Sequence, residues 1–573
     1  MSNLEHRWDL RALFNHDEEA EKFLEVLLKQ AQDFEKKNKD KLKTIKNISR
    51  VIKSYEELLE GVARVMTYAF LKFASQSSCS DFYAACELKC NEIQAYLLFF
   101  EIEFCTLPLE IQQEHLKKSQ KYAYYLQKLV DQKKYQLSLI EEKILLKLSP
   151  LGAEAFSRLF DEFFSNLKIP FKKDEKSEEE ILALLHHKNR DIRKKAQKAF
   201  TQKLQENQML LTYIFNMIRK DLQIKTSLRH YEKKESFRHL SNDITQKSVD
   251  SLVDIINQNM YLVSSYYKHK AEILGYELKD YDRYAPIQTK VQSISYKEGL
   301  EMVLSCFKDF SPLFFQIASR AIKEGWVDSH PRSGKRGGAF SHGAVSNAHP
   351  YVLLNFTGNR RDVFTIAHEF GHMVHQELSK KQGYLNQDTP LTTAETASVF
   401  AEMLLFDSLK QKLPKQELLE IYASKLEDIF STAFRQIVMT NFERRIHEEE
   451  GELKTEELNA IWQEENQKMF GTSVKLTKNY ALWWSYIPHF IHSPFYCYAY
   501  SYGQLLVLAL FGLYQRSDKK KFIKIYTDFL SRGGSQSPRD LILSFGFDVE
   551  DTAFWEIGIE EIRKMLEEFK GLL

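Results

Sequence analysis

The segment that most restricts how this chain can fold is HEFGH, at residues 368–372. Two histidines four positions apart lie on one face of an α-helix, where both imidazoles can bind the same metal ion. His368 and His372 are therefore predicted to be zinc ligands on a helix. Glu369, between them, would flank a bound water molecule and act as its general base.

The residues around this segment repeat with the period of a helix. At about 100° per residue, apolar side chains gather on one side of the predicted helix, namely Val363, Ile366, Ala367, Phe370 and Val374. His375 joins the other two histidines on nearly the opposite side, which makes it a candidate for the outer shell of the metal. We expect the helix to cover residues 362–380, with Asp362 as its N-cap. A row of ordinary surface histidines is the competing interpretation.

Two protein ligands are too few, since a catalytic zinc ion usually has three and keeps one position open for water. Residues 392–402 are typical of a second helix, on which Glu395, Ser398 and Glu402 share one stripe. A carboxylate is seldom buried without a partner. Glu395 is therefore predicted to be the third ligand of one zinc ion per chain, and Glu402 to accept a hydrogen bond from a ligating imidazole. A solvated helix face is the alternative, more so for Glu402.

The chain as a whole is expected to be mainly α-helical. It has only 12 prolines and 21 glycines, and apolar residues recur at helical spacing over the ranges 17–53, 55–107, 110–148 and 191–229. The composition changes between residues 326 and 356, where glycines cluster and a β-like run follows at 351–356. This change predicts a small β-sheet beside the metal-binding helix.

Charge and composition exclude several classes of partner. Lys and Arg total 80 against 79 Asp and Glu, so neither a nucleic-acid groove nor a membrane-attracted face is indicated. The apolar run at 505–513 is shorter than the roughly 18 to 20 residues that span a bilayer, and residues 1–14 lack the apolar core of a secretory signal. The six cysteines do not suggest a disulfide framework, and Cys86 and Cys90 are expected in a helical core. A cytoplasmic protein is expected.

Several segments together resemble one known family. HEFGHMVH is followed about two dozen residues later by a Glu-bearing helix, and further matching segments are YDRYAP at 281–286, a glycine-rich loop at 334–343, IPHF at 487–490 and FYCYAY at 495–500. These residues are similar to the thimet oligopeptidase and oligoendopeptidase F family of zinc metallopeptidases, with the bacterial oligoendopeptidase F branch the closer match. The resemblance covers about 200–573 well and the N-terminal third more loosely.

The resemblance implies a zincin-like helical clamshell whose deep channel admits short peptides and excludes folded proteins. Residues 1–190 would form part of the channel wall, and residues 191–573, with a helical C-terminal part at 415–573, would form the catalytic region. It also implies ligand roles for His368, His372 and Glu395 and the base role for Glu369. In this family a loop and tyrosines from the C-terminal part close on the substrate.

In this chain the candidates for that role are His489 or His492 and Tyr496 or Tyr500. Ser493 and Pro494 independently predict a helix start that would bring the two tyrosines and Gly503 to one face. An aromatic core stripe is the alternative, and it is the favoured interpretation for Trp483, Trp484 and Tyr498.

Two further segments are predicted to contact the peptide. Gly337, Gly338 and Ala339 would form a loop that covers it, with a plain surface loop as the alternative. The strand that begins at Tyr351 would bind the peptide backbone by strand addition. The predicted function is zinc-dependent endopeptidase action on short peptides. The rivals are a zinc carboxypeptidase on a similar helical fold and a helical binding protein with a vestigial motif; the oligomeric state is not indicated.

Overall fold

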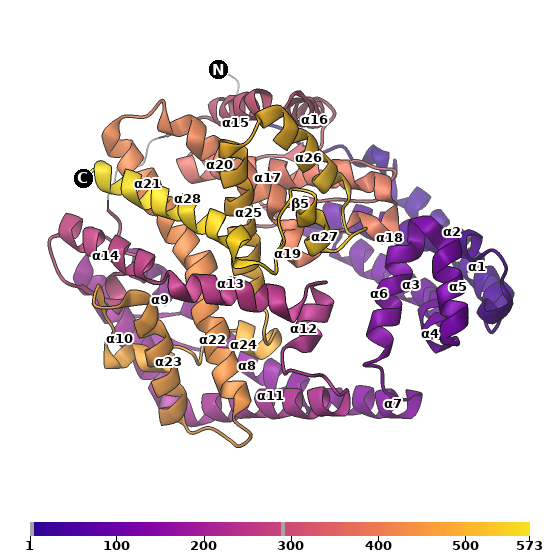
Figure 1. Cartoon of the computed structure of the whole chain (residues 1–573), viewed down its shortest axis with the longest axis horizontal. Helices are drawn as coiled ribbons and strands as arrows, with labels where there is room; N and C mark the ends of the chain where they lie inside the picture. The colour runs from indigo at the N-terminus through magenta and orange to yellow at the C-terminus, as the bar shows by residue number, and fades with distance from the viewer. Residues whose placement is uncertain (1–4, 288–292) are drawn as a thin grey trace. The chain divides into compact units, whose positions relative to one another are not determined.

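The computed structural model describes residues 5–287 and 293–573 (Figure 1). In it, 73% of the protein is helical and the sheets are small, so the predicted mainly α class is confirmed. Over the described residues, none of the helices combines the length and apolarity that a membrane crossing requires. Residues 1–4, the start of the segment tested for a secretory signal, lie outside the described residues.

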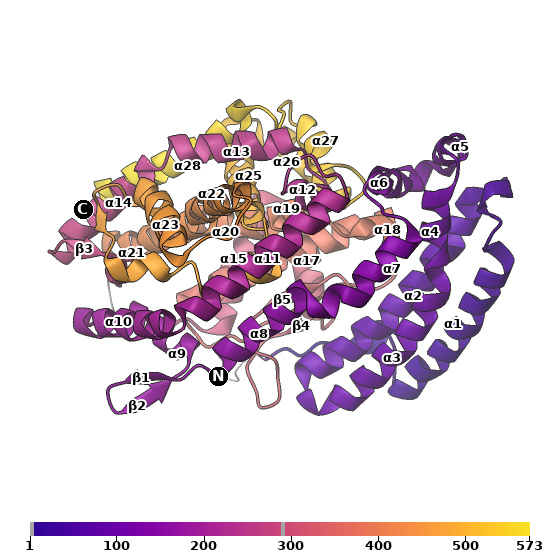
Figure 2. The ribbon, with the colours of Figure 1, turned by 90° about the horizontal axis from the view of Figure 1, so that it is seen from below.

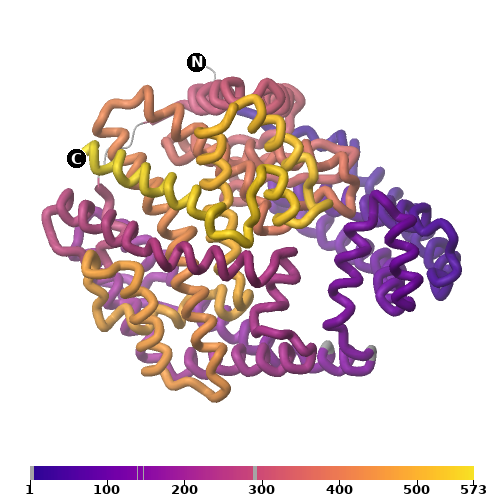
Figure 3. Tube along the Cα trace, viewed as in Figure 1, coloured from indigo at the N-terminus to yellow at the C-terminus, as the bar shows by residue number. Residues whose placement is uncertain are grey.

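The chain divides into two compact units, each assembled from three separate segments. The first unit takes residues 5–134, 293–412 and 514–546, and the second takes residues 135–287, 413–513 and 547–573. The colour of the tube in Figure 3 lets the reader follow the chain through these segments. Residue 190, the predicted boundary, falls inside the second unit, so the chain does not divide there. The clamshell, the channel and the wall role of 1–190 stay predictions.

The first unit contains the segment that is predicted to bind the metal. Its helices are α1 (Asp17–Asn38), α2 (Ile48–Ser75), α3 (Ser80–Leu97), α4 (Phe99–Thr106), α5 (Leu109–Ser119), α6 (Ala123–Lys133), α15 (Tyr296–Phe310), α16 (Pro312–Lys323), α17 (Arg360–Ser379), α18 (Tyr384–Gln387), α19 (Leu391–Ala394), α20 (Thr396–Lys410), α26 (Lys519–Ser531) and α27 (Pro538–Leu543). Its strands are β4 (Val327–Asp328), β5 (Phe340–His342) and β6 (Tyr351–Leu353). Both views of the ribbon show α1, α2 and α3 side by side (Figures 1 and 2).

The second unit is also helical. Its helices are α7 (Leu139–Leu148), α8 (Ala153–Asn166), α9 (Glu178–Ala183), α10 (Arg190–Glu206), α11 (Gln208–Leu228), α12 (Ser236–Ser241), α13 (Gln246–Gln258), α14 (Tyr261–Leu274), α21 (Lys415–Ile429), α22 (Arg435–Glu448), α23 (Thr455–Phe470), α24 (His489–His492), α25 (Tyr498–Arg516, whose last residues count with the first unit) and α28 (Thr552–Gly571). Its strands are β1 (Ile169–Phe171) and β2 (Asp174–Lys176), which form a hairpin, and the parallel pair β3 (Leu278–Lys279) and β7 (Val474–Lys475).

Each of the four long helical stretches predicted from periodicity is broken into shorter helices. α1 ends at Asn38, and Asp40 just beyond it has a φ of 63°. The next helix starts after Asn47, whose side chain accepts a hydrogen bond from the Arg50 main chain. Gln120, with a φ of 34°, separates α5 from α6. Residues with positive φ and helix caps interrupt the main-chain hydrogen bonds, but the apolar side chains keep their helical spacing across the break. Because the prediction used only this spacing, it joined neighbouring helices into one.

The sheet of the first unit has the order β4-β6-β5. β6 runs parallel to β4, with Val352 opposite Val327, and antiparallel to β5, with Val352 opposite Ser341. The Gln376 side chain on α17 donates to the Ser341 carbonyl at 3.1 Å and accepts from the Ser341 hydroxyl at 2.7 Å. The small sheet expected beside the metal-binding helix is therefore confirmed.

The helix predicted to bind the metal, α17, begins with a capping box. The Asn359 side chain accepts a hydrogen bond from the Asp362 main chain at 3.0 Å, while the Asp362 carboxylate accepts one from the Asn359 main chain at 3.3 Å. Asn359 is the N-cap and Asp362 is the third helical residue, so the prediction of Asp362 as N-cap is wrong. The carboxylate reaches back to cap the helix from within its first turn, and the helix spans Arg360–Ser379 rather than 362–380.

Candidate metal centre

The candidate metal centre lies where α17 and α20 cross with their backbones in close approach. Gly371 makes this possible, because a Cβ added there would lie 2.4 Å from the Ala397 carbonyl oxygen and 2.6 Å from the Ser398 Cα. A glycine in a helix interior costs about 1 kcal/mol relative to alanine. The close approach explains why the glycine is nevertheless present. It brings Glu395 and Glu402 beside the histidines of α17.

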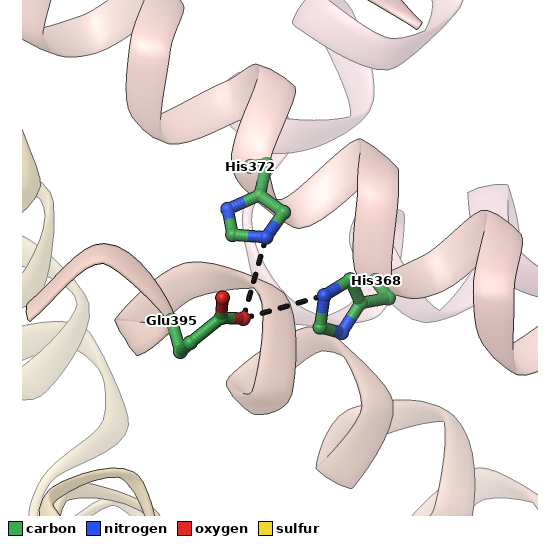
Figure 4. A group of neighbouring side chains, drawn as sticks. All are labelled: His368, His372 and Glu395. Carbon is green, nitrogen blue, oxygen red and sulfur yellow. Dashed lines mark ion pairs between the residues drawn. The ribbon is translucent and has the colours of Figure 1, made fainter. Parts of the chain in front are cut away.

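Three predicted ligands converge on one point (Figure 4). The Glu395 Oε2 atom lies 3.3 Å from the His368 Nε2 atom and 3.3 Å from the His372 Nε2 atom. All three ligand atoms lie within 4.8 Å of one another. Two imidazole nitrogens and one carboxylate oxygen are a donor set used by catalytic zinc sites.

These distances fit a tetrahedral ion. Ligand atoms about 2.0 to 2.1 Å from a tetrahedral zinc ion lie about 3.3 to 3.4 Å from one another, which matches the spacing of Glu395 from both imidazoles. The cluster also remains open to solvent, since 45% of the Glu395 side chain and 27% of the His368 side chain are exposed. A bound ion would therefore keep a coordination position that water or a carbonyl oxygen can reach.

The electrostatics of the cluster favour positive charge. The pKa of His368 is raised to about 9, because the hydrogen bond and the charge of Glu402 outweigh the lowering by burial. The pKa of Glu395 falls to about 2, because the two imidazoles and the Ser398 hydroxyl outweigh the raising by burial. Glu395, beside both imidazoles, and Glu402, behind His368, supply negative charge that stabilises a cation at this point. The residues therefore fit a divalent metal ion.

Glu402 lies where an outer-shell partner is expected. Its Oε1 atom is 2.6 Å from the Nδ1 atom of His368, whose Nε2 atom points toward Glu395. A carboxylate on Nδ1 fixes the tautomer and the orientation of a ligating imidazole. Glu369 is only 6% exposed, and burial raises the pKa of its carboxyl group.

His375 does not occupy the predicted outer-shell position. It is 5% exposed, burial lowers its pKa to about 3, and over the described residues it has no hydrogen bond to His368, His372 or Glu395. His375 shares the face of His368 and His372, but it lies about 4.5 Å further along the helix axis than His372. The prediction for His375 is wrong because face and depth along a helix are separate constraints.

Tyr351 is not available to a substrate. It is fully buried in β6, and both edges of this strand are paired, with β4 on one side and β5 on the other. Strand addition requires a free edge, so the prediction for Tyr351 is wrong. A β-like run reveals a strand but not its position within the sheet.

The glycine-rich loop is exposed at its tip and anchored at its base. Gly337 and Gly338 are exposed, and the Gly338 carbonyl accepts a hydrogen bond from the Asn355 side chain at 2.7 Å. At the base, Lys335 and Arg332 both bind the buried Asp328 carboxylate at 2.7 Å. Ala339 follows the glycines directly before β5. The loop is thus accessible, and its contact with substrate stays a prediction.

The C-terminal candidates lie in the second unit and form two separate groups. The Nε2 atom of His489 is 3.1 Å from the Tyr500 hydroxyl, and the rings of Tyr500 and Tyr496 are 5.1 Å apart at 88°. His492 instead lies 2.8 Å from the Asp161 carboxylate. Trp483, Trp484 and Tyr498 are buried, which confirms their predicted place in the core.

The predicted helix start at Ser493 and Pro494 is wrong. α25 begins at Tyr498, because Phe495 has a φ of 57° and interrupts the helical backbone. The Phe495 main chain donates a hydrogen bond to the Glu443 carboxylate at 2.7 Å, a contact 52 residues away in the sequence. Tyr496 therefore precedes the helix and Tyr500 lies in its first turn.

Two residues of the site were not assigned a role from the sequence. Gly371 allows the helices to approach, and the Ser398 hydroxyl donates a hydrogen bond to the Glu395 Oε2 atom at 2.7 Å. A glycine inside a strongly periodic helix was the available signal for the first. For Ser398 the signal was its place three residues after Glu395 on the same stripe.

Comparison with known sequences places this geometry in context. A family model described as "Peptidase family M3" matches residues 183–561, and one described as "Oligopeptidase F" matches residues 103–169. An oligoendopeptidase F homolog of Borreliella burgdorferi is 29% identical over 592 residues, covering 100% of this chain and 98% of that protein. Oligopeptidase PepF of Bacillus subtilis is 27% identical, covering 99% of this chain and 87% of that protein.

Solved structures share the fold. A crystal structure from Chlamydophila abortus has a TM-score of 0.90 and 22% identity, covering 99% of this chain and 98% of that chain. The structure of oligoendopeptidase F from Enterococcus faecium has a TM-score of 0.70 and 21% identity, covering 97% of this chain and 98% of that chain. At these identities the likeness shows the fold alone.

Proposed function

Because the chain belongs to peptidase family M3 and is therefore a metallopeptidase that acts on peptides, we propose that it hydrolyses internal bonds of short peptides with one zinc ion. The main support for this site is that the Glu395 carboxylate lies at the same distance, 3.3 Å, from His368 and from His372. A zinc ion bound there would activate a water molecule and polarise the scissile carbonyl group.

Glu369 supplies the proton chemistry in this proposal. Its carboxylate accepts a proton from the attacking water molecule and delivers it to the leaving amine. Its place in the same helical turn as the two histidines supports this role, because the water must lie within hydrogen-bonding reach of the base. Glu402 holds His368 in the tautomer that leaves Nε2 free to bind the metal.

The peptide backbone is proposed to pair with β5, the edge strand, rather than with β6. The Val352 main chain donates to the Trp326 carbonyl on the β4 side, so the main-chain groups of Ser341, opposite Val352, face the outer edge of β5. The Ser341 carbonyl already accepts a hydrogen bond from the Gln376 side chain at 3.1 Å, so a peptide would use its second lone pair or displace that contact. Ala339, two residues earlier, has the same orientation if the strand is extended. Main-chain pairing at this edge would give broad tolerance of substrate side chains.

The metal and the cleavage pattern are tested together by one digest. Peptides of graded length, one set blocked at both ends and a matching set unblocked, are incubated with zinc-loaded and chelator-treated protein and analysed by mass spectrometry. Cleavage at internal bonds that requires zinc is expected. Release of single C-terminal residues from unblocked peptides alone would identify a zinc carboxypeptidase, and a protein without bound zinc or cleavage would be a binding protein.

Replacing Glu402 with Ala should weaken zinc affinity or activity by about 10- to 100-fold, as is usual for outer-shell partners. The imidazole of His368 would lose the carboxylate that fixes its orientation. Zinc affinity is measured by competition with a chelator. Asp407→Ala is the control, because Asp407 lies on the same helix and is 4.0 Å from Lys410. Equal zinc affinity in both variants would contradict the role of Glu402.

Tyr500 is proposed to stabilise the oxyanion, with His489 assisting, and Tyr496 is the alternative donor. Their mutual contacts support this choice, since His492 is engaged by Asp161. Removing the donor by a Tyr→Phe change should lower kcat by about 10² to 10³-fold with little change in KM.

The test compares Tyr500→Phe with Tyr496→Phe, each measured for kcat, KM, zinc content and melting temperature. His489→Asn should lower kcat, whereas His492→Asn should change it little and serves as the control. If both tyrosine variants keep kcat within a few-fold, these residues are packing residues and the oxyanion donor lies elsewhere.

Short peptides are the proposed partners, and a cytoplasmic setting is proposed from the cysteine pattern. Cys86 and Cys90 lie one turn apart on α3 and are each 2% exposed. Burial raises the pKa of their thiols to about 11 and about 12. Both are therefore packed as core thiols, as the sequence predicts.

A further inference from the structure

An arginine of the second unit lacks the partner that its chemistry requires. Arg435 begins α22 directly after the π-helical turn Phe430–Phe434, a type of turn that is frequent at functional sites. Its Nη1 atom donates to the Tyr284 hydroxyl at a long 3.4 Å, and the nearby Tyr486 hydroxyl helps to raise the pKa of its guanidinium. Its Nε atom is buried and has no acceptor among the residues that the structure describes. Over residues 5–287 and 293–573, no carboxylate lies within ion-pairing distance of it.

A second arginine adds positive charge at the same place. Arg283 is 3% exposed, and its Nε atom donates to the Asp280 carbonyl at 3.0 Å. Its guanidinium lies 4.7 Å from the centre of the Tyr480 ring and 5.2 Å from that of Tyr284. Arg283 and Arg435 are close enough to repel each other electrostatically. Within the described part of the chain, Arg283 has no ion pair either.

The carboxylates of this neighbourhood are already engaged. Glu427 is bound by Lys270 at 2.5 Å, Asp282 by Arg190 and Arg193 at 2.8 Å each, and Asp280 by the Thr477 main chain at 3.0 Å. The charges of Arg283 and Arg435 are therefore not neutralised locally. Buried charges are normally paired.

Aromatic rings alone do not account for the arrangement. Cation–π contacts with the rings of Tyr480 and Tyr284 can stabilise the positive charge of Arg283, so this residue can have a purely structural role. Arg435 differs, because it is partly exposed and presents its planar fork beside two phenols that carry no charge. The pKa of Tyr284 is lowered, because Arg435 and Arg283 outweigh the raising by burial. The local potential is thus positive, and a guanidinium fork matches a carboxylate in two hydrogen bonds.

We propose that Arg435, with Arg283 behind it and the hydroxyls of Tyr284 and Tyr486 beside it, binds a carboxylate of the peptide substrate. This inference rests on the proposed function and adds a specificity determinant to it. The position within the second unit supports it, because Arg435 acts electrostatically on His489, the partner of the Tyr500 hydroxyl. The free C-terminus of a short peptide is the first source of such a carboxylate, and an acidic side chain is the other.

The binding test uses the zinc-loaded Glu369→Gln protein, which should hold a peptide without cutting it. An N-acetylated pentapeptide is compared as free acid and as C-terminal amide, by calorimetry. The free acid should bind about 10- to 100-fold more tightly, as expected for a hydrogen bond to a charged group. A pair of amidated peptides that differ by Glu or Gln at one position tests the side-chain source.

Arg435→Gln should abolish the preference for the carboxylate, and Arg435→Lys should keep only part of it. Arg445→Gln is the matched control on the same helix, since Arg445 already pairs with Glu464 at 2.8 Å and with Glu465 at 2.8 Å. It should leave the preference unchanged. Tyr486→Phe provides a second, milder variant that should reduce the preference if Arg435→Gln fails to fold, as judged by its melting temperature.

Two results would overturn the inference. The first is equal affinity of the native protein within both pairs, that is, for the free acid and its C-terminal amide and for the Glu and Gln peptides. The second is a folded Arg435→Gln protein that retains the preference for the carboxylate. Neither result affects the proposed peptidase function, which is judged by zinc-dependent cleavage of doubly blocked peptides. Conversely, a protein that cuts no blocked peptide would fail as an endopeptidase while its carboxylate preference could still be measured.

Discussion

A Glu369→Gln protein is expected to bind zinc with native stoichiometry and to lose nearly all hydrolytic activity. The substitution changes one oxygen to an amide nitrogen and leaves His368, His372 and Glu395 in place. A neutral amide cannot accept the proton of the attacking water molecule. Removal of a general base typically costs about 10² to 10⁴-fold in rate, so kcat for a quenched peptide substrate should fall by that factor.

The matched control for this variant is Glu377→Gln. Glu377 lies on the same helix, nine residues from His368 and therefore on the opposite side, where it pairs with Arg320 and Lys380. This control should keep kcat within a few-fold and should hold the same amount of zinc. Near-native cleavage by Glu369→Gln, with zinc content and melting temperature confirmed, would show that another residue is the base.

The site on α17 and α20 could be predicted because its constraints are local. Four-residue spacing fixes which side chains share a helix face, and the reluctance of carboxylates to be buried singles out Glu395 and Glu402. The structure brings these residues together with the two histidines. His375 was misjudged because the pattern gives its direction from the helix axis but not its surroundings.

Features that depend on distant contacts could not be predicted in this way. Tyr351 lies in a strand, as its sequence indicates, but the central position of that strand follows from pairing with both neighbours. Ser493 and Pro494 are typical of a helix start, yet the backbone turns at Phe495 and bonds to Glu443 on another helix. The two units are each assembled from separated segments, which no single boundary in the sequence marks.

Replacing Glu395 with Ala should remove the metal and all metal-dependent hydrolysis. Its carboxylate lies 3.3 Å from each ligating imidazole and supplies the negative charge of the donor set. Two neutral imidazoles bind zinc far more weakly than the three-ligand set that catalytic sites use. Zinc per chain after dialysis, measured by mass spectrometry of the metal, should fall from one to near zero.

The melting temperature gives an independent readout of the same loss. Ligand at about 1,000 times its dissociation constant stabilises the folded state by about 4 kcal/mol, so the native protein should melt at a lower temperature after chelation. The Glu395→Ala protein should melt at the same temperature with and without chelator. A variant that simply unfolds would instead lose its cooperative transition under both conditions.

The Ser398→Ala variant distinguishes the role of the Glu395 carboxylate as a ligand from the role of the hydrogen bond that orients it. The Ser398 hydroxyl donates to the Glu395 Oε2 atom at 2.7 Å, so this variant keeps the ligand and loses only the hydrogen bond that orients it. Zinc should remain bound, with affinity lowered by no more than about 10- to 100-fold. If Glu395→Ala still holds one tight zinc ion per chain, a different carboxylate is the third ligand, and Glu402 is then the residue to replace next because it already contacts His368.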